Sequence, residues 1–85
     1  MKITAKQDTV LKKSDEPVQS SELPDNLKHE VNKGISFIVL AQRDMRQDHV
    51  MVSFDHEIGG FNTWLVYAPH WDGLEPKTKL RKAVV

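Results

Sequence analysis

Two short runs of hydrophobic residues alternating with polar ones begin the chain. Ile3 and Ala5 alternate with polar side chains, and residues 9–12 form a second, β-branched and half-apolar run. This pattern predicts two short strands or one bent strand. Residues 13–22 are polar and contain Pro17 and three serines, so we expect a loop there.

Residues 21–31 are compatible with two local structures. Ser21 is an acceptable helix cap, and apolar residues recur from Leu23 at a four-residue spacing, as in a short helix. The alternative is a turn at Pro24-Asp25, followed by a short strand over residues 27–31. We favour the turn and the strand, because Asn-Lys-Gly at 32–34 then precedes the following strand as a hairpin requires.

The strongest strand pattern covers residues 35–42. One face carries Ile35, Phe37, Val39 and Ala41, and the other carries Ser36, Ile38, Leu40 and Gln42. Because both faces include apolar residues, we expect a central strand. Residues 49–54 form a further strand with Val50, Val52 and Phe54 facing inward, and the charged connection 43–48 predicts that the two strands pair as a hairpin.

The last part of the chain alternates between turn signals and one more strand. Gly59-Gly60 indicates an irregular loop over 55–62, and residues 63–67 form a strand that Pro69 ends. Residues 75–85 are rich in lysine and arginine, which is typical of a solvated tail or a linker. We therefore expect one folded domain over 1–74 and a basic tail over 75–85.

Several short strands without a long helical pattern predict an all-β fold, and closure into a small barrel would limit unpaired strand edges. A chain of 85 residues has room for one core and no second domain. No internal repeat is visible.

Charge and composition limit the classes of partner and of site that we expect for this chain. Twelve basic and twelve acidic residues give a net charge of zero, so we expect neither nucleic-acid nor membrane binding, and we expect a monomer. The chain has no cysteine, which excludes disulfides and thiolate metal sites. No apolar stretch approaches signal-peptide or membrane-span length, so we expect a chain that is not exported, unless it is a module of a longer exported protein.

Four histidines, at positions 29, 49, 56 and 70, raise the question of catalysis or metal binding. None belongs to an HExxH pair, and none shares a local element with a second histidine at ligand spacing, so we interpret them as surface residues beside loops. Asp55 and Glu57 lie close enough in sequence to form a carboxylate pair, yet a glycine-rich loop would position them poorly. No nucleotide-binding motif is present. We expect no enzyme activity, no metal and no cofactor.

Aromatic residues gather near the end of the last predicted strand. The candidate ligand-binding residues are Phe61, Trp64, Tyr67, His70 and Trp71. Trp64 and Tyr67 differ by three positions, so their side chains point to opposite faces of a strand, and one of them belongs in the core. We expect the other to join His70 and Trp71 in a surface groove, where flat rings stack on sugars, prolines or peptide planes. The alternative is a purely structural aromatic cluster.

Several segments together resemble a known family. They are Ile3–Thr9, Leu11–Lys13, Gln19–Asp25, Lys33-Gly34, Asn62–Trp64 and Tyr67–Trp71. These residues are similar to the SH3-like (bacterial SH3-type) modules attached to cyanobacterial cell-wall hydrolases, among them peptidases, amidases and lysozyme-like enzymes. The resemblance covers roughly Lys2 to Gly73. Because no catalytic domain accompanies the resemblance in this sequence, we expect either an excised domain or a stand-alone protein with a changed ligand.

The resemblance implies a small SH3-like barrel of about five to seven short strands. It also implies a non-catalytic module that targets or positions a hydrolase on peptidoglycan, with cell-wall glycan or peptide as its ligand. The alternative is a protein–protein interaction adaptor that recognises an extended peptide or a neighbouring enzyme domain.

Overall fold

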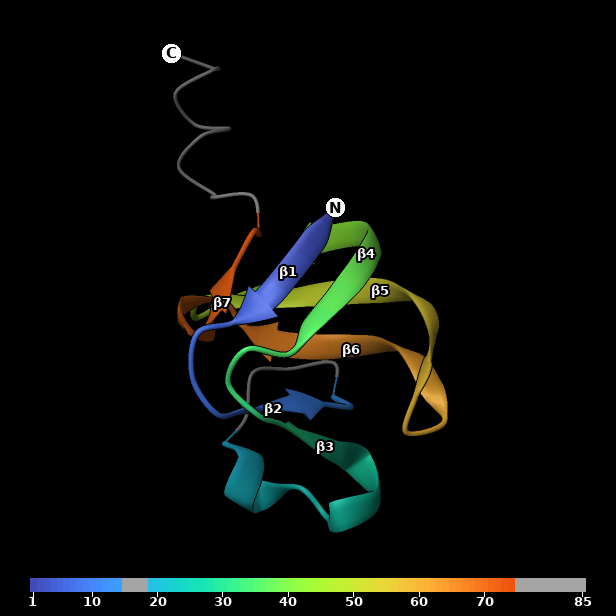
Figure 1. Ribbon diagram of the computed structural model, residues 1–85. Coiled ribbons are helices and arrows are strands. Elements are labelled where there is room, and N and C mark those ends of the chain that lie inside the picture. The colour runs from blue at the N-terminus through green and yellow to red at the C-terminus, as the bar shows by residue number, and fades with distance from the viewer. Residues whose placement is uncertain (15–18, 75–85) are drawn as a thin grey trace.

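The computed structural model describes residues 1–14 and 19–74 (Figure 1). The strands are β1 (Lys2–Ala5), β2 (Thr9–Lys12), β3 (Lys28–Val31), β4 (Ser36–Asp44), β5 (His49–Ile58), β6 (Phe61–Tyr67) and β7 (Trp71–Asp72). Three 3-10 turns lie between them: η1 (Ser20–Glu22), η2 (Asp25–Leu27) and η3 (Ala68–His70). Within the described residues no helix is long and apolar enough to cross a membrane. The predicted basic tail, 75–85, lies outside the described residues.

The seven strands form one antiparallel sheet in the order β3-β2-β6-β5-β4-β1-β7. This arrangement confirms the all-β prediction, although the order ends at β3 and β7 and the sheet is not closed into a barrel. The sheet nevertheless bends strongly, and in Figure 1 β1 and β4 run diagonally across the direction of β5 and β6. The two edge strands are four and two residues long, which limits the unpaired backbone that they present.

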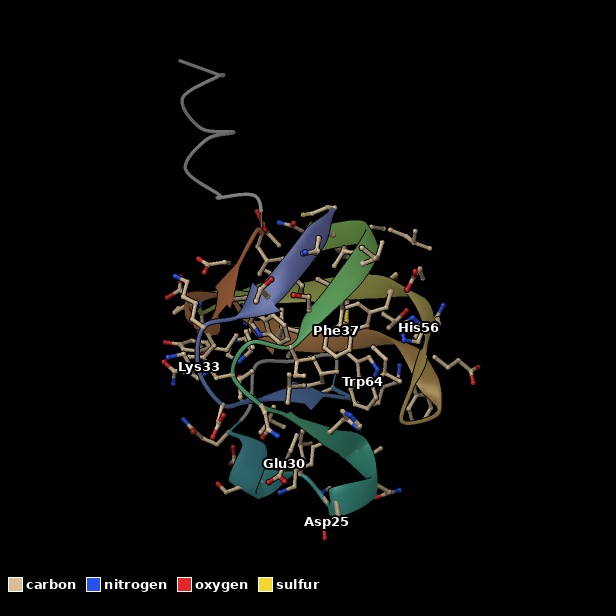
Figure 2. All side chains as sticks on the ribbon, in the orientation of Figure 1. Asp25, Glu30, Lys33, Phe37, His56 and Trp64 are labelled. Atoms are coloured by element: carbon tan, nitrogen blue, oxygen red, sulfur yellow. The ribbon has the colours of Figure 1, made fainter. Side chains whose placement is uncertain are left out.

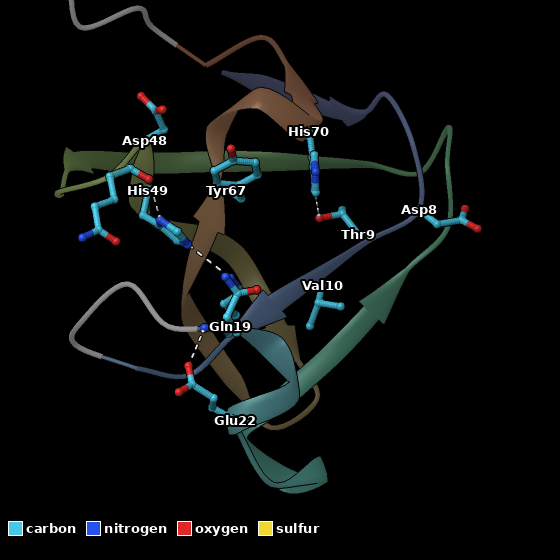
Figure 3. A pocket seen from close by; sticks show the side chains of 11 residues that line it. Asp8, Thr9, Val10, Gln19, Glu22, Asp48, His49, Tyr67 and His70 are labelled. Carbon is cyan, nitrogen blue, oxygen red and sulfur yellow. Dashed lines mark hydrogen bonds between the residues drawn. The ribbon is translucent and has the colours of Figure 1, made fainter.

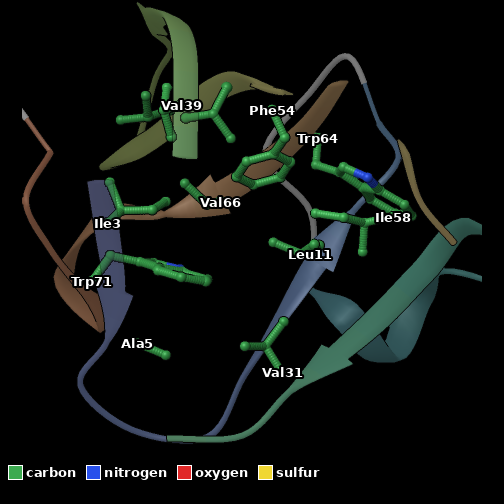
Figure 4. Packing of buried hydrophobic residues seen from close by; sticks show 12 residues of the cluster. Ile3, Ala5, Leu11, Val31, Val39, Phe54, Ile58, Trp64, Val66 and Trp71 are labelled. Carbon is green, nitrogen blue, oxygen red and sulfur yellow. The ribbon is translucent and has the colours of Figure 1, made fainter. Parts of the chain in front are cut away.

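The core lies inside this bend and receives a side chain from every strand (Figure 4). Its members include Ile3, Leu11, Val31, Val39, Val52, Phe54, Trp64, Val66 and Trp71. The predicted inward residues of β5, namely Val50, Val52 and Phe54, are all buried, which confirms their placement. Phe37 from β4 packs on Phe54, with the ring centroids 5.0 Å apart. Burial of this apolar surface is the main contribution that holds the bent sheet together.

Strand β4 lies between β5 and β1, as the prediction of a central strand requires, but only one of its faces is buried. Ile38 and Leu40 are 42% and 69% exposed, so the face opposite Val39 is open to solvent. The register with β5 shifts between Val39 and Ala41, which marks a bulge at Leu40. A bulge increases local bending and twist. It allows β4 to pair with β1 through its first half and with β5 through its second half.

Two connections between strands differ from those predicted. Residues 32–34 do not join a β3–β4 hairpin, because β3 pairs with β2. The main-chain nitrogen of Gly34 donates instead to the carbonyl oxygen of Ala5 in β1. The expected loop 55–62 is largely strand, because β5 continues to Ile58 and β6 begins at Phe61. Gly59 and Gly60 form the two-residue turn with φ of 62° and 94°, which are the positive values that a tight hairpin of this kind requires.

Strand β7 was not expected from the sequence, and it pairs with β1 through Thr4–Asp72 and Ala5–Trp71. The main-chain nitrogen of Lys6 also donates to the carbonyl oxygen of His70, at 2.8 Å. Immediately after β7, the backbone of Gly73 lies against that of Lys2. These contacts attach the two sequence ends of the described domain to one another.

Candidate functional site

The five predicted ligand-binding residues occupy three separate places. Trp64 and Trp71 are 1% and 3% exposed and belong to the core, so the expectation that Trp71 lies in a surface groove is wrong. The reason is the β1–β7 pairing, which turns Trp71 inward beside Phe37, with the ring centroids 6.1 Å apart. Figure 2 shows the Trp64 side chain within the fold, and its indole nitrogen donates to the carbonyl oxygen of Phe61.

Phe61 is 38% exposed and lies at the β5–β6 turn, where its ring meets Trp64 edge-on. Tyr67 and His70 lie at the other end of β6, where their rings contact one another edge-on with centroids 4.7 Å apart. The prediction that Trp64 and Tyr67 point to opposite faces of the strand is confirmed, since Trp64 is core and Tyr67 is half-buried outside it. The structure therefore brings together Tyr67 and His70 and separates them from Phe61.

Tyr67 and His70 line a pocket of about 850 Å³, shown in Figure 3. Its other lining residues are Asp8, Thr9, Val10, Lys12, Gln19, Glu22, Gln47, Asp48 and His49. The lining residues come from four parts of the chain. These are β2 with the residue before it, the segment around η1, the β4–β5 turn with the start of β5, and the end of β6 with η3. Most of them are polar, so the pocket suits a ligand that forms hydrogen bonds.

Three buried polar side chains line this pocket, and two of them, Lys12 and His49, form its floor. Thr9, Lys12 and His49 are 8%, 9% and 7% exposed. They are the buried polar or charged residues of the described chain, and all three line the same pocket. Burying such groups costs free energy unless they are hydrogen-bonded. All three are hydrogen-bonded, Thr9 to His70 and Lys12 to His49, so the pocket contains a buried, hydrogen-bonded polar network.

The sheet register explains how Lys12 and His49 meet. Strand β6 lies between β2 and β5, and Leu65 is opposite Lys12 on one side and Met51 on the other. His49 is two positions from Met51, so its side chain points to the same face. Because Trp64 and Val66 of β6 are in the core, this face is the outer one. The pocket thus lies on the outer face of the sheet, across from the core.

Hydrogen bonds fix the tautomer of His49. Its Nδ1 donates to the main-chain carbonyl oxygen of Gln47 at 2.9 Å, since a carbonyl oxygen only accepts. In a neutral imidazole the other nitrogen is then an acceptor. Nε2 accepts from the Nζ of Lys12 at 3.1 Å. The pair therefore consists of a neutral histidine and a lysine donor.

Burial alters the acid–base behaviour of both partners. The pKa of His49 lies below its ordinary value of 6.5, first because burial penalises the charged ring and further because Lys12 is near. The hydrogen bond to Gln47 and the charge of Asp48 act in the opposite direction and are outweighed. Burial also lowers the pKa of Lys12 from its ordinary 10.5.

Stability is expected to fall as the pH is lowered through 6.5, the ordinary pKa of histidine. Below that value the unfolded chain binds a proton at His49 that the folded chain still excludes, so the free energy of unfolding decreases until the lowered folded-state pKa is reached. Urea denaturation about one pH unit above and below that value measures the effect. The His49→Gln variant keeps a hydrogen-bonding side chain without this titration and should show a smaller decrease. An equal decrease in both proteins would contradict the assignment.

The wall of the pocket is formed by stacked rings. His49 and Tyr67 have ring centroids 5.3 Å apart, and Tyr67 in turn contacts His70. The Nδ1 of His70 is hydrogen-bonded to the Oγ1 of Thr9 at 2.8 Å. Figure 3 shows the rings of His49, Tyr67 and His70, with Thr9 beside His70, around the pocket.

The remaining histidines lie elsewhere. His29 contacts the ring of Trp64, with centroids 6.3 Å apart. His56 is exposed, and its Nδ1 lies 2.6 Å from the Oδ1 of Asp55. It lies near the end of β5 (Figure 2), whereas the pocket residue His49 begins that strand. Glu57 is exposed beside them on the same strand. Among the described residues no group of three or more histidine, aspartate or glutamate side chains could hold a metal ion.

No family model, curated protein or solved structure matches this chain. The site therefore has to be interpreted from its own geometry.

Lys12 and His49 are site residues that were not predicted from the sequence. The prediction that all four histidines are surface residues beside loops is wrong for His49, which is 7% exposed. A usable signal was present, because Val10 and Lys12 alternate with the apolar Leu11, and His49 precedes the inward Val50. Alternation alone places Lys12 and His49 on the outer faces of their strands. It does not show that the two faces are the same surface.

Proposed function

We propose that this chain is a non-catalytic binding module with an SH3-like fold that targets or positions a cell-wall hydrolase on peptidoglycan. The bent, seven-stranded antiparallel sheet supports the fold assignment, together with the resemblance over Lys2 to Gly73. The ligand site is the pocket beside Tyr67 and His70.

The observation that carries this proposal is the buried polar floor beneath a wall of rings. Thr9, Lys12 and His49 are buried, hydrogen-bonded polar residues that line one pocket. A few placed polar groups of this kind fix the orientation of a ligand in a concave site. The rings of Tyr67 and His70 stand at the side, where they can stack on a sugar face or a peptide plane.

The same geometry argues for binding over catalysis. Thr9 and His70 are hydrogen-bonded, as a nucleophile and its base would be. Among the described residues, however, no carboxylate is hydrogen-bonded to His70 to orient it. The N–H donors of an oxyanion hole are also not evident beside Thr9, whose backbone belongs to the β2–β3 ladder. We therefore assign this pair to ligand recognition.

Replacement of Tyr67 by alanine is expected to weaken binding of soluble peptidoglycan fragments about tenfold, because it removes the central ring of the pocket wall. An NMR titration of the labelled protein measures the affinity and maps the site. Resonances of Thr9, His49 and His70 should shift in the wild-type protein. Phe61→Ala is the matched control, since Phe61 lies outside the pocket and its removal should leave the affinity unchanged.

Two outcomes would count against the proposal. An unchanged wild-type spectrum at saturating fragment would remove peptidoglycan as the ligand. Shifts around Phe61 with none at the pocket would move the site to the β5–β6 turn.

A second candidate function is a protein–protein interaction adaptor. It is favoured by one observation, the exposed apolar side chains of Ile38 and Leu40 on the outer face of β4. Resonance shifts along β4 on addition of an extended or proline-containing peptide, with a silent pocket, would favour this function over the first.

A further inference from the structure

The side chain of His49 connects three parts of the pocket. It begins β5, and its Nδ1 donates to the carbonyl oxygen of Gln47 in the β4–β5 turn at 2.9 Å. Its Nε2 accepts from the Nζ of Lys12 in β2 at 3.1 Å. Both ring nitrogens are therefore hydrogen-bonded, as the dashed lines in Figure 3 show, and these bonds fix the orientation of the ring.

The orientation of His49 also places the ring of Tyr67. The two residues are directly opposite one another in the β5–β6 ladder, and their ring centroids are 5.3 Å apart. The backbone next to Tyr67 is held separately, because the main-chain nitrogen of Ala68 donates to the carbonyl oxygen of Asp48 at 2.8 Å. A change at the His49 ring therefore reaches the pocket wall through the side chain of Tyr67.

Protonation of His49 removes the acceptor on which this arrangement depends. In an imidazolium both nitrogens are donors, so Nε2 would face the Nζ of Lys12 as a second donor at 3.1 Å. That contact is no longer a hydrogen bond, and the charge of Lys12 opposes the charge on the ring. Lys12 also has a further interaction besides the one with His49. We therefore expect the His49 ring to be displaced, together with the Tyr67 ring that packs on it.

The charged and titratable groups around His49 determine its response to pH. Burial is the largest influence and lowers its pKa from the ordinary 6.5. The charge of Lys12 from β2 lowers it further, whereas the bond to Gln47 and the charge of Asp48 in the turn raise it. From β6 the facing group is the ring of Tyr67. The other titratable residues of the pocket lining are Asp8, Glu22 and His70.

We propose that neutral His49 holds Tyr67 in the position that the ligand requires, and that protonation of His49 disassembles this part of the pocket and releases the ligand. His49 is thus a positioning residue, because it acts on the ligand through Tyr67. This inference rests on the proposed function for the identity of the ligand, and it adds control by pH to that function.

Linkage sets the direction and the size of the effect. A ligand that binds only the neutral form competes with a proton, so its affinity is constant well above the pKa of ligand-free His49. Below that pKa the affinity falls by up to about tenfold per pH unit. Because burial lowers this pKa, the fall should begin below pH 6.5. Bound ligand should in return lower the pH at which His49 is protonated.

The ligand-free protein tests the positioning step. NMR spectra of the labelled full chain, recorded from about pH 7.5 to about pH 5, follow the ring resonances of His49 and Tyr67. We expect the Tyr67 ring to shift with the midpoint of His49, and the shift to be absent in His49→Gln. Tyr67 resonances that stay constant while His49 is protonated would overturn the inference. A Tyr67 shift that persists in His49→Gln, or a His49 that stays neutral until the chain unfolds, would overturn it as well.

The binding test uses a soluble muropeptide as the probe over the same pH range. In the wild-type protein the loss of affinity should begin at the midpoint measured for His49. His49→Gln should bind more weakly at neutral pH and lose this pH dependence, whereas His70→Gln should bind more weakly and keep it. His56→Gln, outside the pocket, should match the wild-type protein in both respects. If His49→Gln does not fold, the wild-type midpoints decide, and an affinity that stays constant while His49 is protonated contradicts the inference.

The two tests separate this inference from the proposed function. If Tyr67 follows His49 in the ligand-free protein while no muropeptide binds at any pH, the positioning role of His49 stands and peptidoglycan targeting is wrong. If muropeptide binds equally well to the neutral and the protonated protein, peptidoglycan targeting stands and the positioning role is wrong. If Tyr67 does not follow His49 and no muropeptide binds, both are wrong.

Discussion

Replacing Trp71 by alanine is expected to lower the free energy of unfolding by about 3–5 kcal/mol, as large-to-small changes at buried aromatic residues do. The side chain is 3% exposed and packs beside Phe37, so its removal leaves a cavity between β7 and β4. A loss of this size is a large part of the total stability of a small domain. Urea denaturation followed by tryptophan fluorescence of Trp64 measures it.

The control for this change is Phe61→Ala at the β5–β6 turn. Phe61 is 38% exposed, and its carbonyl oxygen, which accepts from Trp64, is retained in the variant. We expect a loss of about 1 kcal/mol there, from the ring contact and a small loss of burial. A Trp71→Ala protein of wild-type stability that fails to bind ligand would show that Trp71 belongs to a surface site after all.

Replacing Gly73 by alanine is expected to lower the free energy of unfolding by several kcal/mol. Gly73 has φ of 101°, which L-residues rarely adopt. An added Cβ would clash with the carbonyl oxygen of Lys2 and would lie 3.2 Å from the Cα of Ile3. Both neighbours are backbone atoms of β1, so relief of the clash requires the β1–β7 pair to move apart. The conformational strain costs about 1–3 kcal/mol, and the displaced strand pair adds to it.

Gly60→Ala separates the two contributions. Gly60 has a similar φ of 94°, but an added Cβ there has nothing within 4 Å. It therefore carries the strain without the clash, and thermal or urea unfolding of the two variants should show Gly73→Ala as clearly the less stable. Equal losses would mean that the close approach of Gly73 to β1 contributes nothing.

The parts of the fold that the sequence predicts are those with local causes. In β5 the alternation of Val50, Val52 and Phe54 corresponds directly to one buried face. In β4 the same criterion fails, because the exposed Ile38 and Leu40 are as apolar as the buried residues of other strands. Neither the bulge in β4 nor the two-residue β7 has a local signature, since both depend on pairing with distant strands.

The residues of the candidate site also divide into those that local sequence predicts and those that depend on distant strands. Tyr67 and His70 are neighbours along the chain, so their clustering could be predicted from the sequence. Lys12 and His49 lie on strands that are separated by β6, and their meeting requires the strand order and the register. The inward turn of Trp71 likewise results from its pairing with Ala5. Aromatic composition alone does not distinguish a core tryptophan from one that stacks on a ligand.

The Lys12–His49 contact joins residues 37 positions apart, across an intervening strand. The pocket floor is therefore assembled together with the sheet and has no counterpart in an unfolded chain. By mass action, a ligand at a hundredfold its dissociation constant would add about 2.7 kcal/mol to the folded state. The ligand-bound protein would consequently resist proteolysis and heat better than the ligand-free protein.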